Sequence, residues 1–173
     1  MMTPTPRDIV AELRQGRLIR LADETGVSLA CDPGHAEAVE HLLDVRKDLV
    51  PAPLPTILIT DSGQLNLYVR PVPDVAWDLI DFAENPLTVL LSNGVNLPEA
   101  FRAQVPVRKT LSEPVRKLIG AFGRGLLTLP FEDAEWPVGL AKPPVSWGEL
   151  PVKIQLPRIM ELGPKGEVAF LRK

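Results

Sequence analysis

The sequence predicts a single α/β domain in which helices pack outside a twisted, mixed β-sheet. Stretches with apolar residues at helical spacing alternate with β-branched apolar runs through the first two thirds of the chain, and only strand-like runs follow. This order argues against a purely parallel, doubly wound sheet. The 173 residues, 45% of them hydrophobic and 24% charged, suit one globular core, so residues 1–173 are taken as one domain.

The first elements are set by caps and turn residues. Thr5 is placed to cap a helix over 7–15, which Gly16 ends. The remaining elements of the first part are expected, in order, as a strand at 17–21, a polar hinge at 22–25, a strand at 26–31, a helix at 35–47, a proline-rich connector at 51–55 and a buried strand at 56–60.

The alternation continues through the middle of the chain. The expected elements are, in order, a short helix ending near 69, a helix at 74–84, a strand at 87–91, a short helix at 97–103, a strand at 105–108, a helix from 112 to 122 that stops at Gly123, and a strand at 126–129. Residues 130–150 are proline-rich and expected to be irregular, and terminal strands are expected at 152–156, 158–162 and 167–171.

Composition excludes several classes of function. A net charge of −3 gives no general attraction to nucleic acid or anionic membrane, so any anion site must be local. One cysteine, Cys31, forms no internal disulfide and is expected to be a buried thiol, while His35 and His41 lack a third ligand for a metal. With no signal-peptide pattern and no apolar run of about 18 residues, we expect a cytoplasmic protein without membrane contact.

Three further features each allow two interpretations. The basic side chains between 102 and 124 could face RNA phosphates or form the solvated side of a helix, and the second is favoured. Trp136 and Trp147 could stack on a base or cover an edge of the sheet, and the cover is favoured. Arg46 and Lys47 could clamp a phosphate or stabilise the C-terminal end of a helix dipole.

Several segments, in order, resemble one family. The run from Gly16 to Asp32 is similar to an opening strand followed by Pro-Thr-Glu-Thr and Tyr-Gly-Leu-Gly-Cys-Asp. Later stretches that match in order are Asn85-Pro86-Leu87-Thr88 for Gly-Pro-Leu-Thr, Val107-Arg108 for a Val-Arg strand, the approach at 123–127 to a Ser-Ala-Asn signature, and 158–162 with 170–172 for the closing motifs. The chain thus resembles the YrdC-like family (YrdC, YciO and YwlC), which includes the threonylcarbamoyl-AMP synthases.

This resemblance implies a twisted α/β sheet with a concave, positively charged cavity. Synthases of the family join threonine, bicarbonate and ATP into threonylcarbamoyl-AMP for tRNA modification, and some members have been regarded as binding double-stranded RNA. It implies no tightly bound cofactor, with ATP and Mg²⁺ as candidate ligands if the chain is active. The residues it implies are Arg46, Lys47, Arg108 and Arg172 for nucleotide or RNA phosphate, and Thr25 and Thr88 for the amino-acid end.

Four departures from the family pattern shape the functional hypothesis. They are Arg46-Lys47-Asp48 in place of Lys-x-Arg, Pro130-Phe131-Glu132 in place of Ser-Ala-Asn, Asp23 in place of the first threonine of Pro-Thr-Glu-Thr, and Pro157-Arg158 near the closing Ser-Thr. The first departure resembles the YciO branch. A carboxylate beside a triphosphate repels it, so these changes favour a nucleotide- or RNA-binding protein with a degenerate site and no assigned catalytic residue.

Two alternatives stay open at this point. One is an active synthase with a rearranged site. The other is a protein-interaction module whose pocket is closed by Phe131 and the proline-rich segment. The sequence leaves the oligomeric state open.

Overall fold

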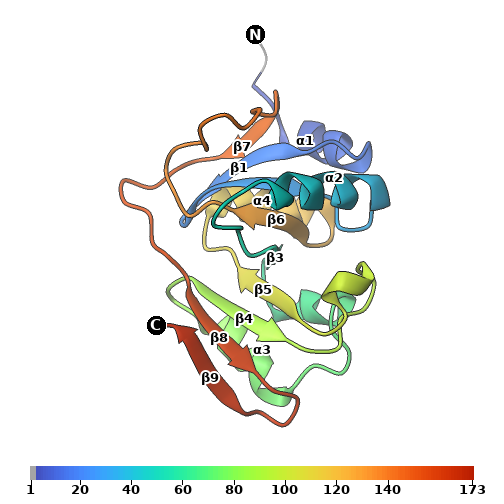
Figure 1. The fold of residues 1–173 in the computed structure, drawn as a ribbon, viewed down its shortest axis with the longest axis vertical. Helices are drawn as coiled ribbons and strands as arrows, with labels where there is room; N and C mark the ends of the chain where they lie inside the picture. The colour runs from blue at the N-terminus through green and yellow to red at the C-terminus, as the bar shows by residue number, and fades with distance from the viewer. Residues whose placement is uncertain (1–2) are drawn as a thin grey trace.

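A computed structural model describes residues 3–173, and its strands form one nine-stranded sheet (Figure 1). In chain order, the helices and strands are α1 (Pro6–Arg14), β1 (Ile19–Asp23), β2 (Gly26–Cys31), α2 (Ala36–Lys47), β3 (Thr56–Ile59), η1 (Ser62–Leu67), α3 (Asp74–Asp81), β4 (Leu87–Leu91), η2 (Glu99–Phe101), β5 (Val105–Lys109), α4 (Glu113–Phe122), β6 (Leu126–Pro130), β7 (Ser146–Gly148), β8 (Arg158–Leu162) and β9 (Val168–Arg172).

The sheet is mixed, as the sequence predicts. Its strand order is β7-β1-β2-β6-β3-β5-β4-β8-β9. The pairs β1/β7, β3/β5 and β4/β8 are parallel, and the other neighbours are antiparallel. Helices lie on both faces, which confirms the predicted α/β class.

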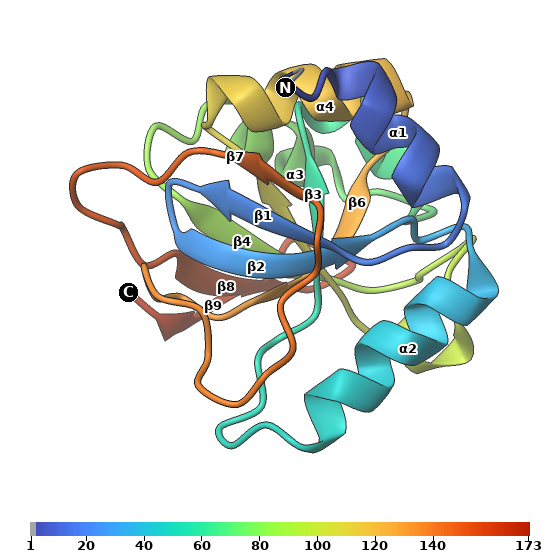
Figure 2. The same cartoon turned by 90° about the horizontal axis from the view of Figure 1, so that it is seen from above.

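Each face of the sheet has its own apolar core. Helices α1 and α4 lie side by side over one face and pack with β1, β3 and β6, while α2 lies on the opposite side (Figure 2). The second and larger core joins α2 and α3 to the other face of the sheet, from β2 through to β8. On the first face, Leu58 of β3 pairs laterally with Arg108 of β5, which pairs with Thr88 of β4. This face therefore continues beyond α1 and α4, and it carries the polar residues described below.

Several predicted boundaries need correction. The predicted hinge begins too early, because Ala22 and Asp23 still belong to β1 and the turn needs only two residues. The helix predicted at 74–84 ends at Asp81. The segment predicted as irregular contains the short strand β7. The strand predicted at 152–156 is wrong, because within residues 3–173 this segment pairs with no strand and its Gln155 N–H donates to Glu24 O alone.

The isolated side chains considered for other chemistry have structural contacts. Cys31 is buried, and burial raises the pKa of its thiol, which leaves it protonated and unreactive at neutral pH. His35 caps α2, with Nδ1 accepting the N–H of Ala38 at 3.2 Å. Trp136 donates to Leu140 O and Trp147 donates to Pro114 O, so both rings are fixed against neighbouring segments.

Across residues 3–173, every helix is too short or too polar to span a bilayer.

Candidate functional site

The tip of the β1–β2 hairpin places three polar residues over β5. Asp23 pairs with Gly26, so Glu24 and Thr25 form a two-residue loop. Asp23 Oδ1 accepts the Thr25 N–H at 2.9 Å and the Thr25 hydroxyl at 2.8 Å. Such a bond from an aspartate to the backbone two residues later fixes a turn, so the loop has one defined orientation.

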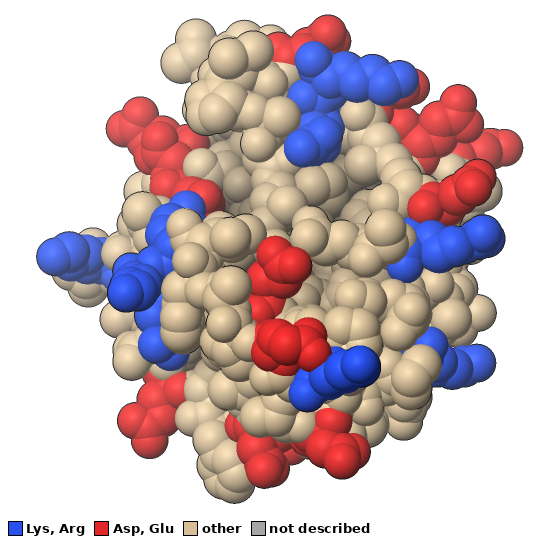
Figure 3. Space-filling model, turned by 60° about the horizontal axis from the view of Figure 1, so that its bottom comes forward, with Lys and Arg blue, Asp and Glu red and all other residues tan. Residues whose placement is uncertain are grey.

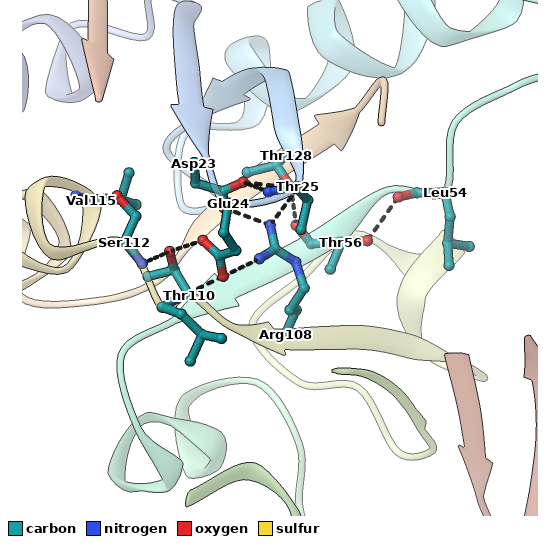
Figure 4. Close-up of polar contacts among 11 residues, drawn as sticks. Asp23, Glu24, Thr25, Leu54, Thr56, Arg108, Thr110, Ser112, Val115 and Thr128 are labelled. Carbon is teal, nitrogen blue, oxygen red and sulfur yellow. Dashed lines mark hydrogen bonds and ion pairs between the residues drawn. The ribbon is translucent and has the colours of Figure 1, made fainter. Parts of the chain in front are cut away.

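Arg108 is the centre of this cluster. Its Nη2 donates to Asp23 Oδ2 at 2.7 Å and to Thr25 Oγ1 at 3.3 Å, and its Nη1 donates to Glu24 Oε2 at 3.0 Å (Figure 4). Glu24 also accepts the backbone N–H of Leu111 at 2.7 Å and the hydroxyl of Thr110 at 3.2 Å. The hairpin tip is thereby tied to β5 and to the segment that leads into α4.

These ionised groups are buried. The side chains of Arg108 and Asp23 are 2% and 1% exposed. Burial alone lowers the pKa of Arg108, but the negative charges of Asp23 and Glu24 more than offset it and raise this pKa. Burial, and then the charge of Asp23, raise the pKa of Glu24 despite its bond to Arg108. Two carboxylates share one guanidinium that is 2% exposed, so a ligand anion cannot reach Arg108 without displacing them.

A row of side chains crosses the same face of the sheet. Arg108, Thr88, Ile159 and Arg172 are successive lateral partners on β5, β4, β8 and β9. Lateral partners point to the same face. The structure therefore brings Thr25, Thr88 and Arg108 together and places Arg172 at the far end of their row.

Arg172 is also paired with a carboxylate. Its Nη1 donates to Glu132 Oε1 at 3.1 Å and its Nη2 to Glu132 Oε2, a two-bond contact, while its Nε donates to Pro157 O at 2.8 Å. The two side chains are 36% and 29% exposed. Glu132 reaches Arg172 from the segment that follows β6, at the position where the family signature ends in asparagine.

A cavity of about 650 Å³ opens beside this ion pair. Its polar side chains are Glu132, Asp133, Glu135 and Arg172, and its remaining lining residues are Leu49, Val50, Pro51, Ala52, Pro53, Leu54, Pro130, Phe131, Trp136, Pro137, Val138 and Ile159. The rings of Phe131 and Trp136 pack edge to face, with their centroids 5.2 Å apart. The cavity thus has an apolar, partly aromatic wall and more acidic than basic groups.

Of the four predicted anion-binding cations, Arg172 lines this cavity and the other three do not, while phosphate binding by any of them stays a prediction. Arg46 does not line the cavity, but its Nε donates to the carbonyl oxygen of Pro53, a lining residue, at 2.6 Å. Lys47 is exposed, pairs with Asp44 at 3.0 Å, and lines a different cavity between α2 and residues 96–98. Consecutive residues of a helix point about 100° apart, which explains why the two separate. Arg108 is buried behind its carboxylates.

The basic residues between 102 and 124 do not form a continuous stripe. Lys109 donates to Asp81 O and Arg116 donates to Thr60 O. Arg124 lies over the Phe122 ring and 3.7 Å from Asp32. Separately, the lower face of the molecule, which Figure 3 shows, has its lysine and arginine side chains in separate groups with acidic side chains between them. The favoured interpretation, ordinary surface cations of a helix and its surroundings, agrees with these contacts.

Sequence reasoning did not identify Glu24 as a site residue or the partners of Asp23 and Glu132. The sequence does show Asp23 and Glu132 as departures from the family pattern, and it shows Glu24 as the retained glutamate of Thr-Glu-Thr. Within residues 3–173 no three His, Cys, Asp or Glu side chains gather as a metal site would require, so the Mg²⁺ expectation stays a prediction tied to ATP.

Comparison with known proteins gives one family. A model for the Sua5/YciO/YrdC domain, described as "Telomere recombination", matches residues 11–130. The threonylcarbamoyl-AMP synthase of Pseudoalteromonas translucida is 33% identical over 123 residues, which are 67% of this chain and 65% of that protein. The threonylcarbamoyl-AMP synthase of Halorhodospira halophila is 32% identical over 131 residues, 70% of this chain and 65% of that protein. The match spans just under two thirds of these curated relatives.

Solved structures share the fold. Escherichia coli YciO superposes with a TM-score of 0.72 at 20% identity, over 99% of this chain and 91% of that one. Sua5 of P. abyssi in complex with L-threonine superposes with a TM-score of 0.73 at 20% identity, over 96% of this chain and 53% of that one. At these identities the likeness establishes the architecture alone.

Proposed function

Because the chain belongs to the Sua5/YciO/YrdC family, we propose that it is a nucleotide-binding member of that family, related to tRNA modification, in which synthase activity is strongly reduced. The ligand occupies the cavity between the proline-rich connector, the segment after β6 and the ends of β8 and β9. Its base contacts the apolar wall around Phe131 and Trp136, and its ribose faces Arg172.

One observation supports the reduced activity above all others. Both arginines of the row, Arg108 and Arg172, are bound to carboxylates of the same chain. Stabilising a triphosphate and its leaving pyrophosphate requires several cations and N–H donors directed at the phosphates. Here the cavity offers one paired arginine against three acidic side chains. A nucleoside or a nucleoside monophosphate fits this charge distribution better than ATP.

The activity is tested by incubating the chain with threonine, bicarbonate, ATP and Mg²⁺ and measuring pyrophosphate release. We expect no release above a blank without protein, with a synthase assayed in parallel as the positive control. Release at a rate comparable to that of the synthase would contradict the loss of activity and favour a rearranged but working site.

Ligand binding is tested by calorimetric titration with adenosine and AMP. We expect both to bind and Trp136→Ala to weaken binding by about fivefold or more, because base–aromatic contacts are worth about 1–3 kcal/mol each. Trp147→Ala is a matched control, since Trp147 is also half-buried and bonded to a backbone carbonyl but lies outside the cavity. Equal losses in both variants, or no binding to the unmodified chain, would reject the proposed site. A short RNA duplex in the same titration tests the RNA alternative.

A further inference from the structure

Glu132 has an unusual backbone conformation. Its φ is +57°, in the left-handed region that non-glycine residues avoid at a cost of about 1–2 kcal/mol. Its neighbours hold it there, because Phe131 N donates to Val27 O at 3.1 Å and Val27 N donates to Asp133 O at 2.8 Å. Backbone strain of this kind persists where the surrounding structure fixes it, often at functional sites.

This conformation directs the carboxylate of Glu132 to the guanidinium of Arg172. The two groups meet through two N–H···O contacts, the arrangement in which arginine binds carboxylate or phosphate groups of ligands. The charge of Glu132 also contributes to the raised pKa of Arg108, so Glu132 lies within electrostatic reach of both arginines of the row. Its carboxylate takes the place of an external anion.

We infer that Glu132 is a built-in counter-anion that determines ligand charge: it occupies the anion-binding side of Arg172 and excludes polyphosphates from the cavity. The ligands that remain are nucleosides and groups with a single phosphate, such as nucleoside monophosphates. This inference rests on the proposed function for the identity of the cavity.

The charges around the cavity also disfavour a polyphosphate. Its lining holds three acidic side chains and one arginine, and in the buried cluster at the other end of the row Asp23 and Glu24 outnumber Arg108. A polyphosphate would have to displace Glu132 and leave its carboxylate beside further negative charge. Removing the charge of Glu132 both frees Arg172 and lowers the repulsion of a ligand anion. Changing Asp23 would instead disturb a buried cluster. Glu132 is therefore the residue to test.

The experiment uses Glu132→Gln, which keeps the side-chain shape, and Glu132→Asn, because asparagine tolerates the left-handed conformation. Inorganic pyrophosphate and adenosine are titrated calorimetrically into the unmodified chain and both variants. We expect pyrophosphate to bind either variant at least tenfold more tightly than the unmodified chain, and adenosine affinity to stay within about threefold. Thermal melting verifies that each variant is folded.

Glu12→Gln is the matched control. Glu12 pairs with Arg17 at 2.6 Å outside this cavity, so its replacement changes the net charge equally. Pyrophosphate affinity that is unchanged in both folded Glu132 variants, or that rises equally in Glu12→Gln, overturns the inference. A gain confined to the Glu132 variants supports it, even if adenosine does not bind and the proposed function fails. Adenosine binding without that gain rejects the inference alone.

Discussion

Replacing Arg108 with methionine is expected to lower the free energy of unfolding by about 3–5 kcal/mol, because it leaves the buried carboxylates of Asp23 and Glu24 without their cation. The pKa of Glu24 is already raised by burial and by Asp23, so loss of the guanidinium removes the main attraction that keeps it ionised. Urea denaturation at neutral pH measures the loss.

Two further variants isolate the cause. Arg172→Met breaks a similar pair that is about one third exposed, and we expect a cost below about 1 kcal/mol. The triple variant Asp23→Asn, Glu24→Gln, Arg108→Met removes every charge of the cluster and should recover part of the stability, because the penalty comes from unpaired buried charge. A loss under 1 kcal/mol in Arg108→Met would show that the cluster does not stabilise the fold.

Gly26→Ala is expected to cost roughly 2–6 kcal/mol, the sum of backbone strain and overpacking. Gly26 has φ +119°, and a Cβ built there would clash with the backbone carbonyl oxygen of Asp133. The segment after β6 would have to move, and Glu132 would move with it. Denaturant midpoints measure the cost, and pyrophosphate titration reports whether Arg172 becomes free.

Gly120→Ala is the control for this substitution. Gly120 lies within α4, and nothing comes within 4 Å of a Cβ built there. Alanine in a helix interior is more stable than glycine by about 0.5–1 kcal/mol, so this variant should be stabilised. A similar effect of the two alanine substitutions would contradict the close approach of Gly26 to Asp133.

Local patterns predicted most of the architecture because caps, turns and apolar periodicity are properties of neighbouring residues. Thr5 caps α1 and Gly123 ends α4 in the left-handed conformation, as the sequence predicts. Strand β7 escaped prediction because three residues are too few for a pattern, and its pairing with β1 is a tertiary contact. The mistaken strand at 152–156 shows the converse: apolar residues alternate there, yet the structure has no strand at these residues.

The site was less predictable because its decisive contacts join distant residues. The sequence marks Asp23 and Glu132 as acids where the family has neutral residues, but not their partners. Asp23 and its partner Arg108 are 85 positions apart in the sequence, and Glu132 and its partner Arg172 are 40 positions apart. The sequence also predicts that Arg46 and Lys47 act together. In the structure their side chains leave the end of α2 in different directions, Arg46 toward Pro53 and Lys47 toward Asp44. Whether these cations bind phosphate stays a prediction.

The attachment of the hairpin tip to β5 has a kinetic consequence. Glu24 and Arg108 are 84 residues apart, so the long loop between them must close before their bond can form. Contacts of such long sequence separation slow folding, and contacts made after the transition state act mainly on the unfolding rate. We expect that weakening this attachment accelerates unfolding and leaves the refolding rate nearly unchanged.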